Sequence, residues 1–316
     1  MLKFYEASAI IQKLGFLATF LTNAVFITLT LFYTKRIPGA YRKLLVIFAS
    51  TCIVFSSLEI IVEPCIHVFN GGAVYFSLNR LTESDWLFQL QTFFLIVYGS
   101  CYAAQLAFIA IQFSFRYFTF TRHPFRRIFQ GWHQLIWISY IFAIGALYGW
   151  LIYYFLQPDD FSDSYFEQEM SRIYGRDIRK TSRLMVVPYD NGKSRGNIIA
   201  YFCAEFVIMD SQYIIIIICA IRMQQAMKSQ LSEMSTRNRN LERQFFKALS
   251  VQIILPTFFI TIPVGSILIL PLFEMKVSLQ GCIIFALYSL YPTADSIATM
   301  MIVSEYKCSW KGGLAQ

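Results

Sequence analysis

Long apolar stretches separated by short polar segments dominate the chain. Seven of them are long enough to cross a hydrocarbon core of ~30 Å at ~1.5 Å per residue. They cover residues 10–33, 44–64, 87–115, 133–156, 197–221, 248–272 and 279–303. The pattern predicts an all-α membrane protein, in which residues 1–316 form a single seven-transmembrane helix bundle.

The Lys and Arg residues between the apolar stretches indicate the orientation of the bundle. Loops 34–43, 116–131 and 222–247 are rich in these residues, and the short tail 304–316 adds Lys307 and Lys311. The alternate segments are poor in them, except the long loop 157–196, where acidic residues balance the basic ones. Because basic loops stay in the cytoplasm, we predict an extracellular N-terminus, an extracellular 157–196 loop and a cytoplasmic C-terminus.

Composition excludes several classes of protein. Hydrophobic residues make up 56% of the chain and charged residues only 15%, whereas soluble domains carry about 25% charged residues. The net charge of +8 is spread over the loops that face membrane lipid, so we expect no nucleic-acid partner. The cysteines and histidines lack the spacing of a metal site, and we expect no metal and no cofactor.

Other seven-helix proteins require residues that this chain does not place suitably. A retinal protein needs a lysine in its last helix, and residues 277–303 contain none. An intramembrane aspartyl protease needs two facing aspartates, but Asp210 and Asp295 are predicted at different depths. The sequence contains no nucleophile elbow or phosphate-binding loop, so we do not expect this chain to be an enzyme. The remaining layout is that of a G-protein-coupled receptor.

Candidate switch residues lie in the cytoplasmic halves of the predicted helices. Prolines remove a backbone donor and kink helices, and the last two helices contain several, although prolines are also common in membrane helices generally. A buried carboxylate near cations at the inner face forms an ion pair that opens on activation, although the same cations also serve as solvated anchors. The candidates for activation and G-protein coupling are Arg116, Tyr117, Lys247, Pro256, Tyr291, Pro292 and Asp295.

A series of short motifs, in a fixed order along nearly the whole chain, resembles the nematode seven-transmembrane serpentine chemoreceptors of the Str type. The motifs are Asn23, Gly39-Ala-Tyr-Arg-Lys-Leu-Leu45, Glu59 to His67 with Pro64, Phe115-Arg-Tyr117, Gln244-Phe-Phe-Lys-Ala-Leu249 with Gln252 and Pro256, and Tyr291-Pro292 with Asp295 and Glu305-Tyr-Lys307. Phe115, Ser296 and Lys307 depart from the residues usual in the family.

The resemblance implies a chemosensory receptor for a small-molecule odorant or pheromone. It also implies a heterotrimeric G protein as partner, and a location in the plasma membrane, in the sensory cilium of a chemosensory neuron. The alternative is a seven-helix ligand-gated cation channel of the insect odorant-receptor kind, which has its N-terminus inside the cell.

The ligand pocket of such a receptor is expected in the outer half of the bundle. Candidate ligand-binding residues by depth are Glu63, His67, Phe94, Tyr98, Glu205 and Tyr288. Glu59 and Glu63 lie four residues apart and share a helix face, and we expect no basic residue in the outer helix halves to pair with them. Each aromatic position is also compatible with ordinary helix packing.

The cysteine positions predict that no disulfide joins the outer end of the third helix to loop 157–196. Loop 157–196 has no cysteine, and Cys65 is the cysteine clearly near the outer face, so packing or charge must hold the loop. An acidic block followed by a basic block in this loop is compatible with a short lid helix or with a solvated loop. Cys308, just past the last helix, is a candidate for palmitoylation.

Overall fold

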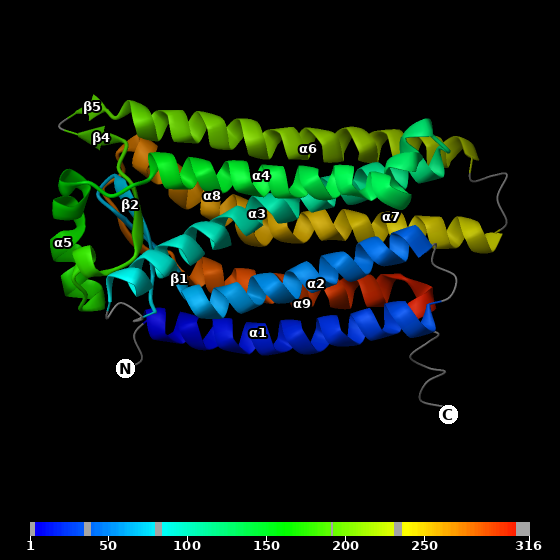
Figure 1. Ribbon diagram of the computed structural model, residues 1–316, viewed down its shortest axis with the longest axis horizontal. Coiled ribbons are helices and arrows are strands. Elements are labelled where there is room, and N and C mark those ends of the chain that lie inside the picture. Colours follow the sequence, from blue (N-terminus) through cyan, green and yellow to red (C-terminus); the bar gives the residue numbers. More distant parts are fainter. Residues whose placement is uncertain (1–3, 35–38, 80–83, 191, 231–235, 308–316) are drawn as a thin grey trace.

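The computed structural model describes residues 4–34, 39–79, 84–190, 192–230 and 236–307, without the side chains of residues 230, 237 and 238. Long helices run side by side, and a small sheet with one helix covers one end of the bundle (Figure 1). We call this the lid end and the opposite end, near the C-terminus, the tail end. The bundle helices are α1 (Phe4–Thr28), α2 (Gly39–Val62), α3 (Asp85–Phe120), α4 (Gln134–Phe155), α6 (Gly196–Gln230), α7 (Thr236–Pro256), α8 (Ile262–Ile269) and α9 (Cys282–Ile302).

Hydropathy identifies most of these helices as membrane spans. In the described ranges, six helical segments are long and apolar enough to cross a membrane, and α7 and α8 belong to one of them. The further helix, α9, carries serines, threonines, tyrosines and Asp295 among its apolar residues. The predicted seven-helix bundle is therefore confirmed, with α9 as its seventh helix.

The polar residues of α9 find partners on α1. Thr19 contacts the Thr293 hydroxyl at 3.1 Å, and the Ser296 hydroxyl donates to the Asn23 side-chain oxygen at 2.8 Å. A Cβ at Gly15 would lie 2.3 Å from the Ser289 hydroxyl, so glycine lets the two backbones approach closely. Small residues and interhelical hydrogen bonds of this kind drive helix association in membranes.

The sixth helix of the bundle is irregular where the prolines occur. α7 ends at Pro256, a π-helical turn follows at Thr257–Thr261, and α8 then contains Pro263. Proline removes a backbone donor, and a π-turn re-pairs the displaced carbonyls. The Tyr213 hydroxyl of α6 contacts the Thr257 and Thr261 hydroxyls at 3.0 and 2.9 Å, which fixes the irregular turn against its neighbour.

An antiparallel sheet closes the lid end. Its strand order is β3 (Arg183–Val186), β2 (Gly72–Ser77), β1 (Pro64–Phe69) and β6 (Ser278–Gln280), and a separate hairpin is formed by β4 (Tyr189–Asp190) and β5 (Lys193–Ser194). Side chains alternate along each strand. On β2, Tyr75 packs into the bundle core, while Val74 and Phe76 pack into a second core beneath the lid helix.

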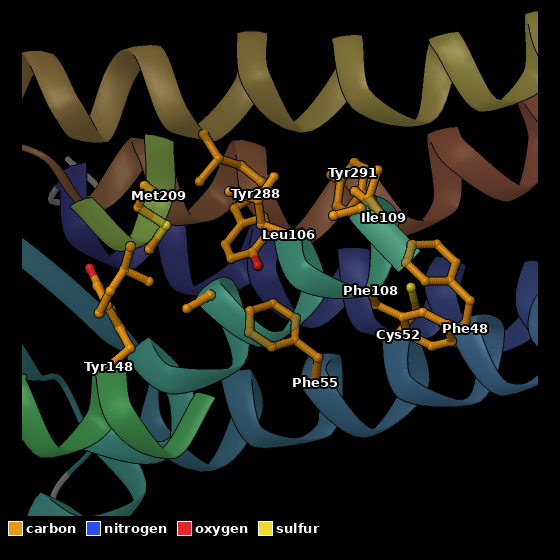
Figure 2. Packing of buried hydrophobic residues seen from close by; sticks show 14 of the residues in the cluster. Phe48, Cys52, Phe55, Leu106, Phe108, Ile109, Tyr148, Met209, Tyr288 and Tyr291 are labelled. Atoms are coloured by element: carbon orange, nitrogen blue, oxygen red, sulfur yellow. The ribbon is translucent and has the colours of Figure 1, made fainter. Parts of the chain in front are cut away.

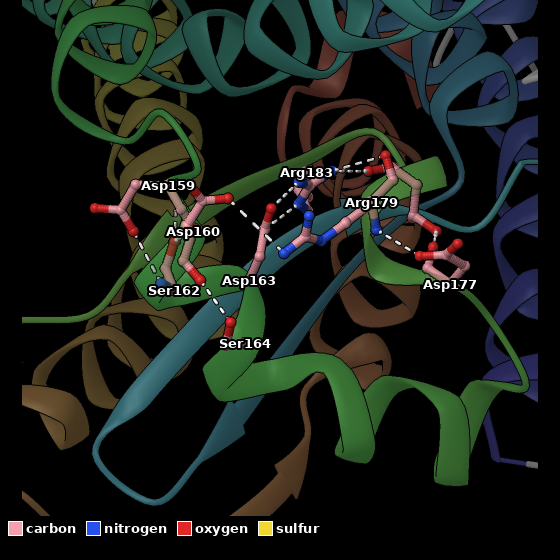
Figure 3. A network of polar contacts seen from close by, with 9 residues as sticks. Asp159, Asp160, Ser162, Asp163, Ser164, Asp177, Arg179 and Arg183 are labelled. Carbon is pink, nitrogen blue, oxygen red and sulfur yellow. Dashed lines mark hydrogen bonds and ion pairs between the residues drawn. The ribbon is translucent and has the colours of Figure 1, made fainter.

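The lid helix, α5 (Asp160–Tyr174), packs on the outer face of this sheet. The Asp159 carboxylate accepts the Ser162 backbone N–H in a capping box, and Gly175 ends the helix at φ 62°. Figure 3 shows the acidic residues at the start of α5 facing the basic residues that follow it. Of the two possibilities left open by the sequence, the acidic half forms the helix, and Arg183 returns in β3 to bond Asp163 at 2.5 and 2.7 Å.

A disulfide joins the sheet to the bundle, which corrects the sequence expectation. Cys65 on β1 and Cys282, the first residue of α9, are bonded with Cα atoms 4.5 Å apart. Cys282 was assigned to the interior of a membrane span, yet it lies at the lid end and is fully buried. The expectation that Cys65 is the cysteine clearly near the outer face was wrong, because the seventh helix begins at Cys282 and places this cysteine at the same end.

Candidate functional site

A cluster of aromatic rings lies in the lid-end half of the bundle around one acidic side chain. We call Glu59, Phe55, Tyr75, Tyr98, Phe285 and Tyr288 the cage. The Phe55 ring lies 4.7 Å from both the Tyr98 and Tyr288 rings, and Tyr75 stacks on Phe285 at 5.7 Å. Three helices and the lid sheet contribute these residues, so the cage lies where the lid meets the bundle.

The two acids of α2 have different surroundings. Lys13 of α1 lies 3.0 Å from the Glu63 carboxylate, so the expectation that no basic residue pairs with either acid was wrong for Glu63. Lys13 was overlooked because it lies inside an apolar run, where a lysine extends its charged end toward the surface. Glu59 is 1% exposed, and its Oε1 has no hydrogen-bond partner among the described residues.

The other predicted ligand residues lie in three places. Tyr98 and Tyr288 belong to the cage, where the Tyr288 hydroxyl donates to the Gln105 Oε1 at 3.2 Å. Glu205 accepts a hydrogen bond of 3.2 Å from the Tyr148 hydroxyl, between α6 and α4. Phe94 packs against the bundle core from a half-buried position on α3.

His67 lies on the face of β1 that points to the lid helix rather than to the bundle. Its ring contacts the Tyr174 hydroxyl at 3.3 Å and lies 3.6 Å from the Glu169 carboxylate. Burial lowers the pKa of His67 despite the nearby carboxylate. Burial alone would raise the pKa of Glu169, but hydrogen bonds from Arg172 and Ser278 outweigh it and lower that pKa.

Acidification should destabilise the lid through His67. The unfolded state binds a proton near pH ~6.5, whereas the folded state resists protonation until a lower pH, so folding stability falls as pH falls. Because the pKa of Glu169 is lowered, protonation of this carboxylate changes the folding stability only below about pH 4.3, which is outside the pH range in which His67 titrates. We expect the melting temperature of the purified protein to fall between pH 7.5 and 5.5.

His67→Gln should flatten this pH dependence, because glutamine does not titrate. His133→Gln is the matched control, since His133 is exposed near the tail end. An unchanged slope in His67→Gln would contradict the assignment.

A cavity of about 470 Å³ lies between α2, α3 and α4. Its walls are almost wholly apolar and include Val54, Trp137 and Phe142, of which Val54 and Phe142 are mostly exposed on the surface of the bundle. Phe55 of the cage lines the same cavity, and so does Gln105, which accepts a hydrogen bond from Tyr288 of the cage. The cavity and the cage are therefore adjacent.

Arg116 anchors a second cluster at the tail end. Its guanidinium lies 3.3 Å from the Glu242 carboxylate of α7 and 4.4 Å from the ring centroids of both Tyr41 and Phe245. The side chain is 3% exposed, although it carries a full charge. The cluster therefore links α2, α3 and α7 through one ion pair and two cation–π contacts.

Asp295 pairs with an amide rather than with a cation. The Gln252 side chain of α7 donates to Asp295 Oδ2 at 3.1 Å, and Oδ1 has no partner in the described part of the chain. The amide of Gln112 on α3 is also buried without a described partner. The expected ion pair between Asp295 and an inner-face cation is therefore absent from the described residues, where Arg116 pairs with Glu242 instead.

The remaining predicted switch residues occupy different positions. Tyr291 and Pro292 are buried in α9, and the Tyr291 ring stacks on Tyr288 at 6.2 Å. Tyr117 is half-buried and Lys247 is exposed. Pro256 ends α7, and Cys308, the candidate for lipidation, lies outside the described residues.

The sequence did not identify several partners that complete these clusters. Tyr41, Glu242 and Phe245 surround Arg116, yet each is separated from it by many residues. Cys282 is the clearest missed signal. Counting depth from the lid end would have placed it beside Cys65.

Six membrane-type helical segments and the further helix α9, with an arginine held between the third and sixth members of the bundle, have the layout of a G-protein-coupled receptor. Residues 8–310 match the family model "Serpentine type 7TM GPCR chemoreceptor Str". The chain belongs to this family and is a G-protein-coupled chemoreceptor, as the sequence motifs predicted. The family is a receptor family, and the channel alternative is not favoured.

Related proteins agree with this assignment. The chain is 31% identical to the Caenorhabditis elegans "G-protein coupled receptor str-33", over 96% of this chain and 89% of the relative. It is 26% identical to "Serpentine receptor class r-10" of Caenorhabditis briggsae, over 93% and 86%. Its fold resembles the crystal structure of squid rhodopsin with a TM-score of 0.60 and 10% identity, over 96% and 83% of the two chains.

Proposed function

We propose that the chain is an odorant or pheromone receptor of the plasma membrane of a sensory cilium, with its lid end outside the cell. It binds a small molecule in the lid-end half of the bundle and activates a heterotrimeric G protein at the tail end.

Two features support this orientation. Disulfides persist in oxidising compartments, and the Cys65–Cys282 bond lies at the lid end. The loops at the tail end contain the predicted excess of Lys and Arg, which marks the cytoplasmic side. The N-terminal end of α1 then faces outward, opposite to the orientation of the channel class (Figure 1).

The Arg116 cluster is the observation that carries G-protein coupling. Outward movement of α7 would withdraw both Glu242 and Phe245 from Arg116, and the freed guanidinium would face the cytoplasm. The irregular turn after Pro256 supplies a point where α7 bends against α8. The proposed coupling region also includes residues at the tail end and residues that pack within α9. They are Tyr117, Lys247, Tyr291, Pro292 and Asp295.

The proposed ligand site centres on Tyr98 and Tyr288 of the cage. Phe94 lies on α3, the helix that carries Tyr98, and Glu205 lies on α6, whereas Glu63 and His67 contribute through the rim and the lid. The cavity beside Phe55 provides adjacent apolar space for a small molecule.

Two measurements on cells test this proposal. An epitope tag at the N-terminus should be readable on intact cells, and an odorant panel should cause dissociation of a co-expressed G protein, measured by energy transfer between its subunits. A tag readable only after permeabilisation, together with ligand-gated current in the absence of G protein, would support the channel class instead.

A further inference from the structure

We propose that Glu59 and the cage rings bind a small organic cation, such as a protonated or quaternary amine, as the activating ligand. This inference rests on the proposed function and names the chemical class of its ligand. Glu59 was not among the site residues predicted from the sequence.

The first observation is an acid without a counter-charge. Glu59 is 1% exposed, and its Oε1 has no hydrogen-bond partner in the described structure. An isolated carboxylate is costly in an apolar interior, so such a group is normally paired, hydrogen-bonded or neutralised. A ligand that brought a positive charge would remove this cost and gain a charge-assisted hydrogen bond.

The second observation is that the ion pairs described near the lid end all involve acids other than Glu59. Lys13 contacts Glu63, and four arginines of the lid contact acids of the lid helix and its N-terminal cap. The lid pairs are Arg172–Glu169, Arg179–Asp160, Arg183–Asp163 and Arg195–Asp159. None of these described pairs involves Glu59, whose counter-charge is therefore left for a ligand to supply.

The third observation is the aromatic wall around the carboxyl group. The hydroxyls of Tyr75, Tyr98 and Tyr288 lie within electrostatic range of the Glu59 carboxyl group. The Tyr98 hydroxyl is buried without a described hydrogen-bond partner. Aromatic faces attract ammonium groups, and clusters of rings recognise methylated amines.

The cage also has a route by which it can enlarge. Its rings are closely packed, with Phe55 only 4.7 Å from Tyr288, and Figure 2 shows these two side chains in the bundle interior. Phe55 also lines the cavity of about 470 Å³ between α2, α3 and α4. Rotation of Phe55 into this cavity would open space beside Glu59 without unfolding a helix.

Glu205 provides a contrast within the same half of the bundle. Its carboxylate already accepts a hydrogen bond from Tyr148, whose hydroxyl also contacts Tyr201 at 3.3 Å. This acid therefore has a hydrogen-bond partner within the protein, unlike the Oε1 atom of Glu59.

The test compares amines with neutral molecules of the same shape on the full-length receptor. Cells expressing the receptor and a G-protein sensor receive tetramethylammonium, primary alkylamines and neutral analogues such as neopentyl alcohol, and the same compounds are added to purified receptor in thermal-shift measurements. We expect at least one amine to activate and stabilise the receptor, whereas its neutral analogue does neither. Glu59→Gln should raise the half-maximal concentration at least about 30-fold, since a buried charge partner is lost.

Two variants separate recognition from folding. Asp210→Asn should change the amine response by less than about threefold, since Asp210 is exposed on α6 and lies outside the cage. Tyr98→Phe keeps the ring but removes the hydroxyl and should weaken amine binding less than Glu59→Gln does. If Glu59→Gln fails to reach the surface, the response of Tyr98→Phe and the thermal shift of the wild type still decide the question.

The outcomes distinguish this inference from the proposed function. Neutral odorants that activate the receptor, with no amine activating or stabilising it, would overturn the cation site but leave the receptor function intact. No stabilisation by any amine at millimolar concentration would also overturn it. G-protein coupling is tested without a ligand, because Glu242→Gln should raise basal signalling. The absence of such a rise would count against the proposed function rather than against the cation site.

Discussion

Replacing both Cys65 and Cys282 with serine should remove most of the receptor from the cell surface. The disulfide connects residues 217 positions apart and ties the lid sheet to the first residue of α9. Loss of a native disulfide typically costs about 2–5 kcal/mol, a large share of the ~5–15 kcal/mol that keeps proteins folded. Surface labelling and the melting temperature of the purified protein would both report this loss.

The reason for such a large effect is the position of the bond between two cores. Cys65 and Cys282 are both fully buried under the lid helix, in the core that contains Phe76, Phe166 and Tyr174. Without the bond, β1 can separate from α9 and expose this core together with the cage beneath the sheet.

Cys203→Ser is the control for the disulfide variant. Cys203 is a free, exposed cysteine on α6, so its replacement should leave surface level and melting temperature unchanged. A double serine variant that reached the surface at the level of Cys203→Ser, with the same melting temperature, would show that packing alone holds the lid.

The helices were predictable because membrane spans are encoded locally. A run of about 20 apolar residues is sufficient to specify a helix in a bilayer, where the backbone must satisfy its own hydrogen bonds. α9 was recognised despite its polar residues, although the contacts that accommodate them, such as Ser296 with Asn23, join residues more than 270 positions apart.

The lid was not predictable for the opposite reason. β1 and β2 pair with each other locally, but the sheet is completed by β3 and β6, which come from distant loops. β6 has only three residues, and β1, β2 and β3 are buried on both faces, so no alternation of polar and apolar residues reveals these strands. The disulfide was not predictable for the same reason, because its two cysteines meet only when the second and seventh helices lie together.

The candidate site was predictable only in part. The motif around Arg116 identified one half of the tail-end cluster, while Glu242 lies in a polar segment that contains several other charged residues. In the lid-end half, pattern alone could not separate Glu59 from Glu63. The difference between them depends on Lys13, whose side chain comes from another helix.

Breaking the ion pair at Arg116 should raise basal signalling. Glu242→Gln removes the charge that holds the guanidinium while preserving the shape of the side chain. The pair is 3.3 Å long and the Glu242 side chain is 24% exposed, so its contribution is about 1 kcal/mol. That energy corresponds to about a fivefold shift toward the active state and a similar rise in basal G-protein activation.

Arg116→Ala should act in the opposite direction and abolish signalling. It removes both the ion pair and the two cation–π contacts with Tyr41 and Phe245, but it also removes the cation that we propose to face the G protein. Ligand-free energy-transfer measurements, normalised to surface level, would separate the two variants. If the ion pair between Arg116 and Glu242 breaks during activation, removing the acid should raise basal signalling, whereas removing the arginine should lower it.

Arg243→Gln is the matched control, because Arg243 is exposed and adjacent to Glu242 on α7. Its basal signalling should equal that of the wild type if the effect belongs to the pair rather than to the net charge of the loop. Equal basal signalling in Glu242→Gln and Arg243→Gln would remove the proposed lock. Retained ligand responses in Arg116→Ala would in turn assign G-protein contact to other residues of the tail end.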